Sequence, residues 1–299
     1  MAAVGARPYD VTMVTWGAVI WLSAVASVSL AFGSAGAAEP VVPGTVPVAP
    51  GEFLAGSSPA ERERAYRLDE DAYGHSITRE NGWYDGERTL QTLSVAGFSI
   101  MRAPVTNSEY AQFLAETGRP VPAIDRDGWR AQGLVHPYDR VLRHVWDGGS
   151  YPPGRAAHPV VLVTWDDANA YSAWLSDRTG RRWRLPSEIE WEKAARGTDG
   201  RAFPWGDDWD PGRLNSHDRG PFDTVAVGSY PAGASPYGMV DAAGQVFEWT
   251  STPAGNGRFI VQGGSWDDKG CGVCRPAARH GRPRQLRHIL VGFRLVRDD

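Results

Sequence analysis

Three short segments of the chain begin with a helix-capping signature and end at a glycine. The capping pairs are Thr106 with Glu109, Thr164 with Asp167, and Ser187 with Glu190, and the terminating glycines are Gly118, Gly180 and Gly197. A hydroxyl side chain followed three residues later by a carboxylate satisfies free N–H groups at a helix start, and glycine readily adopts the conformation that ends a helix. The sequence therefore predicts three short helices with long stretches of other structure between them.

Those intervening stretches are rich in turn-forming and aromatic residues. The chain contains 35 Gly and 22 Pro among its 299 residues, together with 13 Trp and 10 Tyr. Such a composition favours loops held in place by aromatic packing, and it argues against coiled coils, helical bundles and disordered chains. Strand-like runs are short, and we predict them at 94–101, 159–163, 259–262 and 292–297.

The N-terminal segment has the pattern of an export signal. An apolar run from Val11 to Phe32 follows Arg7, and small residues then lead to a possible cleavage point after Ala37 or Ala38. We predict a signal peptide over 1–38, a Pro-rich tether over 39–51 and one domain over 52–299. The alternative is that residues 11–32 stay in place as a membrane anchor.

The charge balance limits the possible partners. Lys and Arg total 31 against 35 Asp and Glu, which gives a formal charge of −4, and no basic cluster is present. Nucleic acid is therefore not an expected partner. We expect a periplasmic or secreted protein with no membrane contact beyond the signal segment; the sequence leaves its oligomeric state open.

Seven ordered strings in the chain resemble one known family. They are PVTNSEY (104–110), HPVVLVTWDDA (158–168), RLPSEIEWEKAARG (184–197), FPWGD (203–207), GQVFEWT (244–250), GGSW (263–266) and VGFRL (291–295). In this order they resemble the formylglycine-generating-enzyme family, also called the sulfatase-modifying-factor family, which includes hercynine oxygenases and pyoverdine-maturation proteins. The resemblance covers about Pro43 to Asp299. It implies a single loop-rich α+β domain related to the C-type lectin-like fold.

The resemblance also implies an oxidative site after the GGSW string. The family's best-known enzyme oxidises a substrate cysteine to formylglycine with dioxygen, using two cysteines to hold Cu(I), a soft ion that thiolates select. In this chain Asp268 occupies the place of the first cysteine, and Cys271 corresponds to the second, with Cys274 three residues later. Cys271 and Cys274 are therefore candidate catalytic copper ligands, but a disulfide and a thiol–disulfide exchange site are open alternatives.

Calcium is the other cofactor that the resemblance implies. Glu248 matches a family calcium ligand, with Gln245 in the place of the usual Asn, and Asn215 resembles a residue of a second calcium loop with Asp218 or Asp223 as partner. The alternative is that these residues only form turns and caps.

The expected function is the modification or maturation of another exported molecule. The leading hypothesis is an oxygen-dependent oxidoreductase acting on an exported protein or small molecule, with the substrate along the Ser265–Arg279 loop. One alternative is a non-catalytic binding or accessory module that assists maturation of a periplasmic metalloenzyme or a siderophore. Another is an oxidative tailoring enzyme whose cysteines are structural. The non-haem iron site of hercynine oxygenases has no counterpart in the histidine spacing.

Overall fold

The three predicted helices lie where their caps indicate. In the computed structural model, which describes residues 43–134 and 136–298, they are α3 (Asn107–Thr117), α6 (Trp165–Thr179) and α7 (Glu188–Arg196). Each has both capping hydrogen bonds, and each ends at the expected glycine. The prediction of these helices is confirmed.

Further helices were not predicted. They are α1 (Pro59–Tyr73), α2 (Ile77–Glu80), α4 (Arg126–Ala131), α5 (Tyr138–Val141) and the 3-10 turns η1 (Pro231–Gly233) and η2 (Gly272–Cys274). The longest of these, α1, has a good N-cap in Ser58, which accepts a hydrogen bond from the Glu61 N–H, and it ends at Gly74. Its strongly charged sequence leaves a weak apolar stripe, so helical periodicity was hard to recognise.

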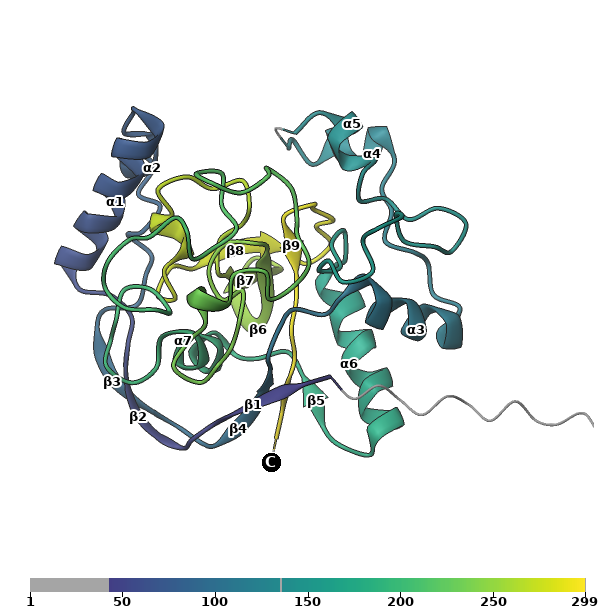
Figure 1. Cartoon of the computed structure of the whole chain (residues 1–299), viewed down its shortest axis with the longest axis horizontal. Coiled ribbons are helices and arrows are strands. Elements are labelled where there is room, and N and C mark those ends of the chain that lie inside the picture. Colours follow the sequence, from purple (N-terminus) through teal and green to yellow (C-terminus); the bar gives the residue numbers. More distant parts are fainter. Residues whose placement is uncertain (1–42, 135, 299) are drawn as a thin grey trace, which may run out of the picture. The chain divides into compact units, whose positions relative to one another are not determined.

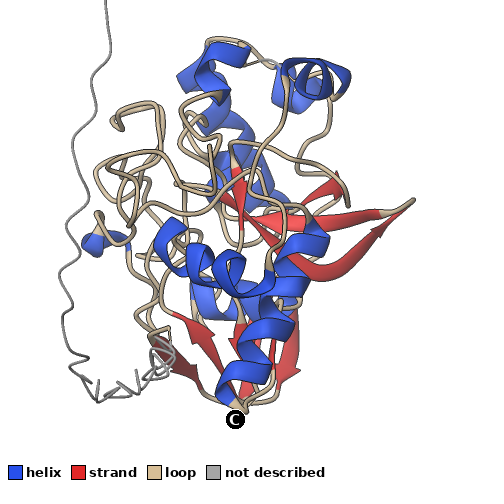
Figure 2. Cartoon of the chain, turned by 90° about the vertical axis from the view of Figure 1, so that its right-hand side faces the viewer, coloured by secondary structure: helices blue, strands red, loops and turns tan. Residues whose placement is uncertain are grey.

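The strands form two four-stranded sheets and a two-stranded sheet (Figure 1). They are β1 (Thr45–Val48), β2 (Gly51–Ala55), β3 (Gln91–Val95), β4 (Phe98–Met101), β5 (Trp183–Arg184), β6 (Phe247–Gly255), β7 (Arg258–Gln262), β8 (His280–Pro283), β9 (Val291–Gly292) and β10 (Val296–Arg297). The sheet orders are β1-β4-β10-β5, β2-β3 and β8-β7-β6-β9. All pairs are antiparallel except β6 with β9. Long loops connect these elements (Figure 2), so the domain is a mixed α/β fold rich in loops.

The strand predictions were only partly correct. The run 259–262 lies within β7, whereas 94–101 is divided between β3 and β4. The run 292–297 contains the last residue of β9 and the two-residue strand β10. The run 159–163 is not a strand. Its residues are buried, but the Val160 N–H bonds to Val105 and the Leu162 N–H to His288, and Leu162 has a φ of 61°. Because successive residues pair with different segments, no ladder forms.

The N-terminal boundary of the domain differs from the expected one. Thr45–Val48 lies within the predicted tether but forms strand β1. It pairs with β4 in antiparallel register, with Thr45 opposite Met101 and Val48 opposite Phe98. The predicted signal segment 1–38 lies outside the described residues. Within the described part of the chain, no helix has the length and apolar character needed to cross a membrane.

Two of the sequence strings meet in the core as a buried ion pair. Glu248, from GQVFEWT on β6, and Arg294, from VGFRL, both have no exposed surface. The guanidinium donates two hydrogen bonds of 2.6 Å to the carboxylate, and the Trp191 Nε1–H donates a third at 2.7 Å. These strings therefore fix the packing of β6 against α7 and the C-terminal segment.

Candidate functional site

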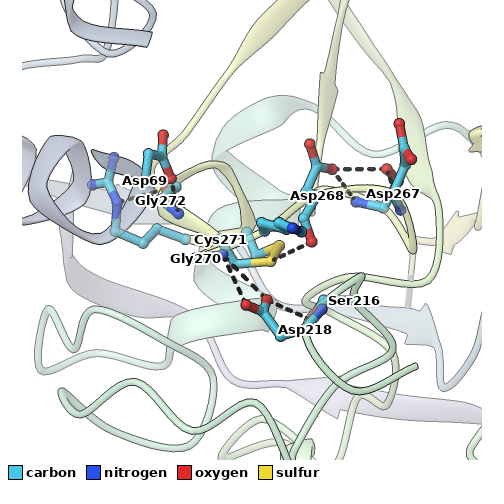
Figure 3. Close-up of a disulfide and its surroundings, with 12 residues drawn as sticks. Asp69, Ser216, Asp218, Asp267, Asp268, Gly270, Cys271 and Gly272 are labelled. Carbon is cyan, nitrogen blue, oxygen red and sulfur yellow. Dashed lines mark hydrogen bonds between the residues drawn. A yellow bond between two sulfur atoms is a disulfide. The ribbon is translucent and has the colours of Figure 1, made fainter. Parts of the chain in front are cut away.

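Cys271 and Cys274 form a disulfide at the turn η2 (Figure 3). Their Cα atoms are 4.8 Å apart, and neither residue has exposed surface. Cys271 itself has a φ of 53°, a left-handed conformation that a non-glycine residue adopts only when its surroundings hold it there. The surroundings of this loop therefore determine its shape.

Helix α1 supplies much of that support. The Asp69 carboxylate accepts hydrogen bonds from the Gly272 N–H at 2.9 Å and from the Tyr84 hydroxyl at 2.5 Å. On the other side of the loop, the Gly270 N–H donates to Asp218 at 3.1 Å. Figure 3 shows Asp69 and Asp218 on either side of the cysteine turn. Close packing adds to this, because a Cβ on Gly270 would lie 2.3 Å from the Leu68 carbonyl oxygen.

The segment after the disulfide is fixed by a buried cation. The Arg275 guanidinium pairs with Glu87 at 2.5 Å and Glu61 at 3.2 Å, and its Nε–H donates to the Gly272 carbonyl. Burial raises the pKa of Glu61, although Arg196 and Arg275 oppose that change. The loop is thus held by charged groups from the region before residue 90, to which no site role was assigned from the sequence.

The oxidised cysteine pair does not fit Cu(I). A disulfide presents no thiolate, and thiolates are the ligands that select this ion. Asp268, at the place of the family's first cysteine, is also engaged, because its carboxylate accepts hydrogen bonds of 2.7 Å from both the N–H and the hydroxyl of Ser265. We therefore derive no chemical step through copper.

The four candidate calcium ligands do not come together as one set of free oxygens. The Glu248 carboxylate is paired with Arg294, and the Asp223 carboxylate is paired with Arg155 at 2.6 and 2.9 Å. Asn215 and Gln245 do touch, since the Asn215 amide donates to Gln245 Oε1 at 2.8 Å.

One oxygen in this group fits a cation. Asn215 Oδ1 is buried and has no hydrogen-bond partner among the described residues. This atom lies near the Ser216 carbonyl oxygen. A Cβ built on Gly220 would be 2.2 Å from Asn215 Oδ1 and 2.6 Å from the Ser216 oxygen. In the described residues no group of three His, Cys, Asp or Glu side chains is arranged to hold a metal ion. Asn215 thus remains the residue where a calcium proposal can be tested.

A pocket of about 470 Å³ lies beside the cysteine loop, and we call it the histidine pocket. Polar side chains contribute much of its wall, namely His136, His280, His288, Arg258, Arg282, Asp267 and Asp268. Apolar surface comes from Trp83, Phe247, Leu286 and Leu290, among others. Its size suits a small-molecule ligand or a few residues of a peptide.

Two of the histidines are kept neutral by their surroundings. Burial, together with the positive charges of Arg282 and Arg275, lowers the pKa of His280 to about 3. Burial likewise lowers the pKa of His288 to about 3. His136 is placed differently, with its Nε2 atom 3.1 Å from Asp267 Oδ2. The pocket therefore combines neutral imidazoles with a histidine–carboxylate contact.

Asp268 is the pocket carboxyl best suited to proton transfer. Its pKa is raised to about 7, because burial and the nearby Asp267 charge outweigh the opposing effect of the Ser265 hydrogen bonds. A group whose pKa lies near neutrality can both accept and release a proton under physiological conditions.

The expected substrate loop contributes part of the pocket wall, and most of the other lining residues were not predicted. Asp267, Asp268 and Val273, all within the expected Ser265–Arg279 loop, line the pocket. His136 and Trp83 come from distant loops with no chemical motif, and nothing in their spacing indicated that they meet. Arg279, by contrast, pairs with Glu188 of α7 at 2.8 Å.

Comparisons with known proteins show the family of the chain. Residues 32–299 match the family described as "Sulfatase-modifying factor enzyme 1-like domain". Hercynine oxygenase of Mycolicibacterium smegmatis is 32% identical over 255 residues, a match covering 72% of this chain and 56% of the relative. The chain thus spans about half the length of that relative.

A second relative is the mouse protein named inactive C-alpha-formylglycine-generating enzyme 2, which is 34% identical over 229 residues, covering 65% of this chain and 72% of the relative. Among solved structures, PvdO from Pseudomonas aeruginosa superposes with a TM-score of 0.66 at 23% identity, covering 86% of this chain and 95% of that one. This likeness shows the fold. Because the family match spans most of the chain, the protein belongs to the sulfatase-modifying factor enzyme 1-like family.

Proposed function

We propose that this chain is an exported, oxygen-dependent oxidoreductase that modifies another protein or a small molecule in the histidine pocket. The observation that carries the proposal is that the segment directly after GGSW forms a wall of that pocket through Asp267, Asp268 and Val273. The family resemblance places reactive residues in this segment. The oxygenase among the relatives supports an oxidative role.

The residues of the pocket suit the proton transfers that oxidation requires. In the simplest balance, the substrate loses two electrons and two protons, and dioxygen accepts them as hydrogen peroxide. Asp268, with a pKa of about 7, accepts a proton from the substrate, while His280 and His288 stay neutral and offer hydrogen bonds without adding charge.

A second candidate is a non-catalytic binding module on the same scaffold. The closed disulfide and the aspartate at the place of the first cysteine favour it, since neither supplies the thiolates of the copper enzymes. A relative that is named inactive shows that the family name alone does not guarantee activity.

The test is an oxygen-dependent search for products. The purified protein is incubated in air and under argon with culture supernatant of the source cells, and mass changes and oxygen uptake are measured. We expect a product that needs oxygen and is lost in Asp268→Asn but kept in Arg284→Gln, whose guanidinium pairs with Asp166 on the surface. Equal product lists in air and argon would support the binding module instead.

Counting free thiols and measuring Cu(I) binding test whether Cys271 and Cys274 hold copper. Free thiols are counted under denaturing conditions, and Cu(I) is then titrated into the reduced protein against a competing chelator. A closed disulfide and no tight copper binding are expected for oxidation that does not use the cysteines. Two free thiols with tight one-to-one binding would return Cys271 and Cys274 to the role of metal ligands.

A further inference from the structure

The histidine pocket contains a guanidinium with no acidic partner. Arg282 lines the pocket from β8, and no carboxylate of the described residues lies within ion-pair distance of it. Among the described residues its guanidinium makes one long hydrogen bond, 3.5 Å, to the neighbouring Gly281 carbonyl. Most other arginines near the site are paired, as Arg275 and Arg279 are. A desolvated guanidinium without a counter-charge costs free energy unless a ligand supplies one.

A second arginine also lines the pocket. Arg258 of β7 also lines it, and its guanidinium donates to the Gly281 carbonyl next to Arg282. Burial and the positive charge of Arg258 both lower the pKa of Arg282, because like charges repel, whereas the Asp268 carboxylate raises it. An anion placed between them would relieve that repulsion.

The charges facing the pocket select an anion of low charge. Arg258 and Arg282 contribute two positive charges, and Asp267 contributes one negative charge that His136 already contacts. Asp268 is partly protonated near neutral pH, and His280 and His288 are neutral. The remaining balance is at most about one positive charge, which a single carboxylate neutralises and a dianion would exceed.

Other groups indicate what else the ligand carries. The Nε2 atom of His280 is buried with no hydrogen-bond partner among the described residues, so it is available to a polar ligand atom. Its ring lies edge-on to Trp83 at 6.1 Å and to Phe247 at 5.9 Å. Trp83 is 42% exposed, which is unusual for so large an apolar side chain and leaves it open to a flat or apolar group.

We infer that the histidine pocket binds a carboxylate-bearing molecule, with Arg282 and Arg258 holding the carboxylate and Trp83 covering its apolar body. That this molecule is the substrate rests on the proposed function. Binding of the carboxylate itself does not depend on oxidation. A carboxylate matches the planar, two-pronged geometry of a guanidinium and forms charge-assisted hydrogen bonds with it.

The test uses a pair of probes that differ only in charge. N-acetyltryptophan has one carboxylate and an aromatic body, and N-acetyltryptophanamide is its neutral match. Calorimetry should show the acid binding at least about tenfold more tightly than the amide, since a hydrogen bond to a charged group contributes roughly 1.5–3 kcal/mol. The tripeptide Gly-Gly-Trp is a second probe, because its carboxylate is the C-terminus of a peptide. Comparing it with N-acetyltryptophan distinguishes a peptide end from a small free acid, and tight binding of either probe supports carboxylate recognition.

Variants assign the effect to Arg282. Arg282→Gln should remove the preference for the acid, Arg282→Lys should keep part of it, and the surface control Arg284→Gln should keep all of it. Equal binding of acid and amide to the unaltered protein, or an unchanged preference in Arg282→Gln, would overturn the inference. Acid binding without any oxygen-dependent product would keep it and count against the proposed oxidation, so the two failures are distinguishable.

Discussion

The Glu248–Arg294 pair and the wall of the histidine pocket differ in whether their charged and polar groups have partners within the protein. In the core, every oxygen of the Glu248 carboxylate has a donor, and Arg294 also donates to the backbone carbonyls of Met101, Arg102, Val240 and Asp241. In the pocket, Arg282 has no acidic partner and His280 Nε2 has no hydrogen bond among the described residues. The satisfied region stabilises the fold, whereas the unsatisfied one is available to a ligand.

The largest expected effect comes from breaking the core pair. Glu248→Gln leaves the Arg294 charge buried without its carboxylate, and loss of one partner of a buried pair costs about 3–5 kcal/mol. The free energy of unfolding, measured with urea, should fall by that amount. Arg284→Gln is the matched control, because its pair with Asp166 is exposed and such pairs contribute about 0–1 kcal/mol. A loss no larger than that of the control would show that the core pair is not the support we describe.

Removing the disulfide should have a smaller effect. Closing a four-residue loop stabilises by about 2 kcal/mol in the chain-entropy description. The double variant Cys271→Ser with Cys274→Ser should therefore unfold at lower urea concentration. Its affinity for N-acetyltryptophan should stay unchanged, because Asp69 and Asp218 still hold the loop. Loss of binding in a folded double variant would mean that the disulfide, and not those carboxylates, shapes the pocket wall.

The elements that could be predicted from the sequence are those whose hydrogen-bond partners are local. Thr106, Thr164 and Ser187 act on N–H groups within three residues of themselves, so local spacing was enough to place α3, α6 and α7. The segment 159–163 has strand-like residues, but its backbone partners, Val105 and His288, are set by the tertiary fold. Local propensity gives no information about such partners.

The candidate site divides in the same way. Asp267 and Asp268 were within reach because they follow the GGSW string directly. His136, Arg258 and Trp83 enter the pocket from three separate segments, and only the folded chain brings them together. The relation to the C-type lectin-like fold and the export of the chain stay predictions.

Calcium binding tests whether Asn215 has a purely structural role or holds a ligand. We propose that its free Oδ1 binds Ca²⁺, an ion that prefers oxygen ligands. An ion that binds only the folded state at 100 times its Kd stabilises by about 2.7 kcal/mol, and each kcal/mol raises the Tm by about 2–4 °C in a domain of this size. A chelator should lower the Tm by several degrees in the unaltered protein and not in Asn215→Ala. No chelator effect on the unaltered protein would place Asn215 among purely structural residues.

A change in how stability depends on pH tests the pocket wall alone. Burial raises the pKa of Asp268 from its ordinary value of 3.8 to about 7 in the folded protein. The unfolded chain therefore releases this proton first, and the stability that the protonated carboxyl contributes is complete below about pH 4 and is lost as pH rises through 7. Asp268→Asn cannot ionise, so its Tm should improve relative to the unaltered protein between pH 5 and pH 8. His280 and His288 act in the opposite direction, since their lowered pKa values reduce stability as pH falls from 6.5 towards 3. Their contribution is the same in both proteins and cancels in the difference, so a Tm difference that does not change with pH would contradict the proton-accepting role of Asp268.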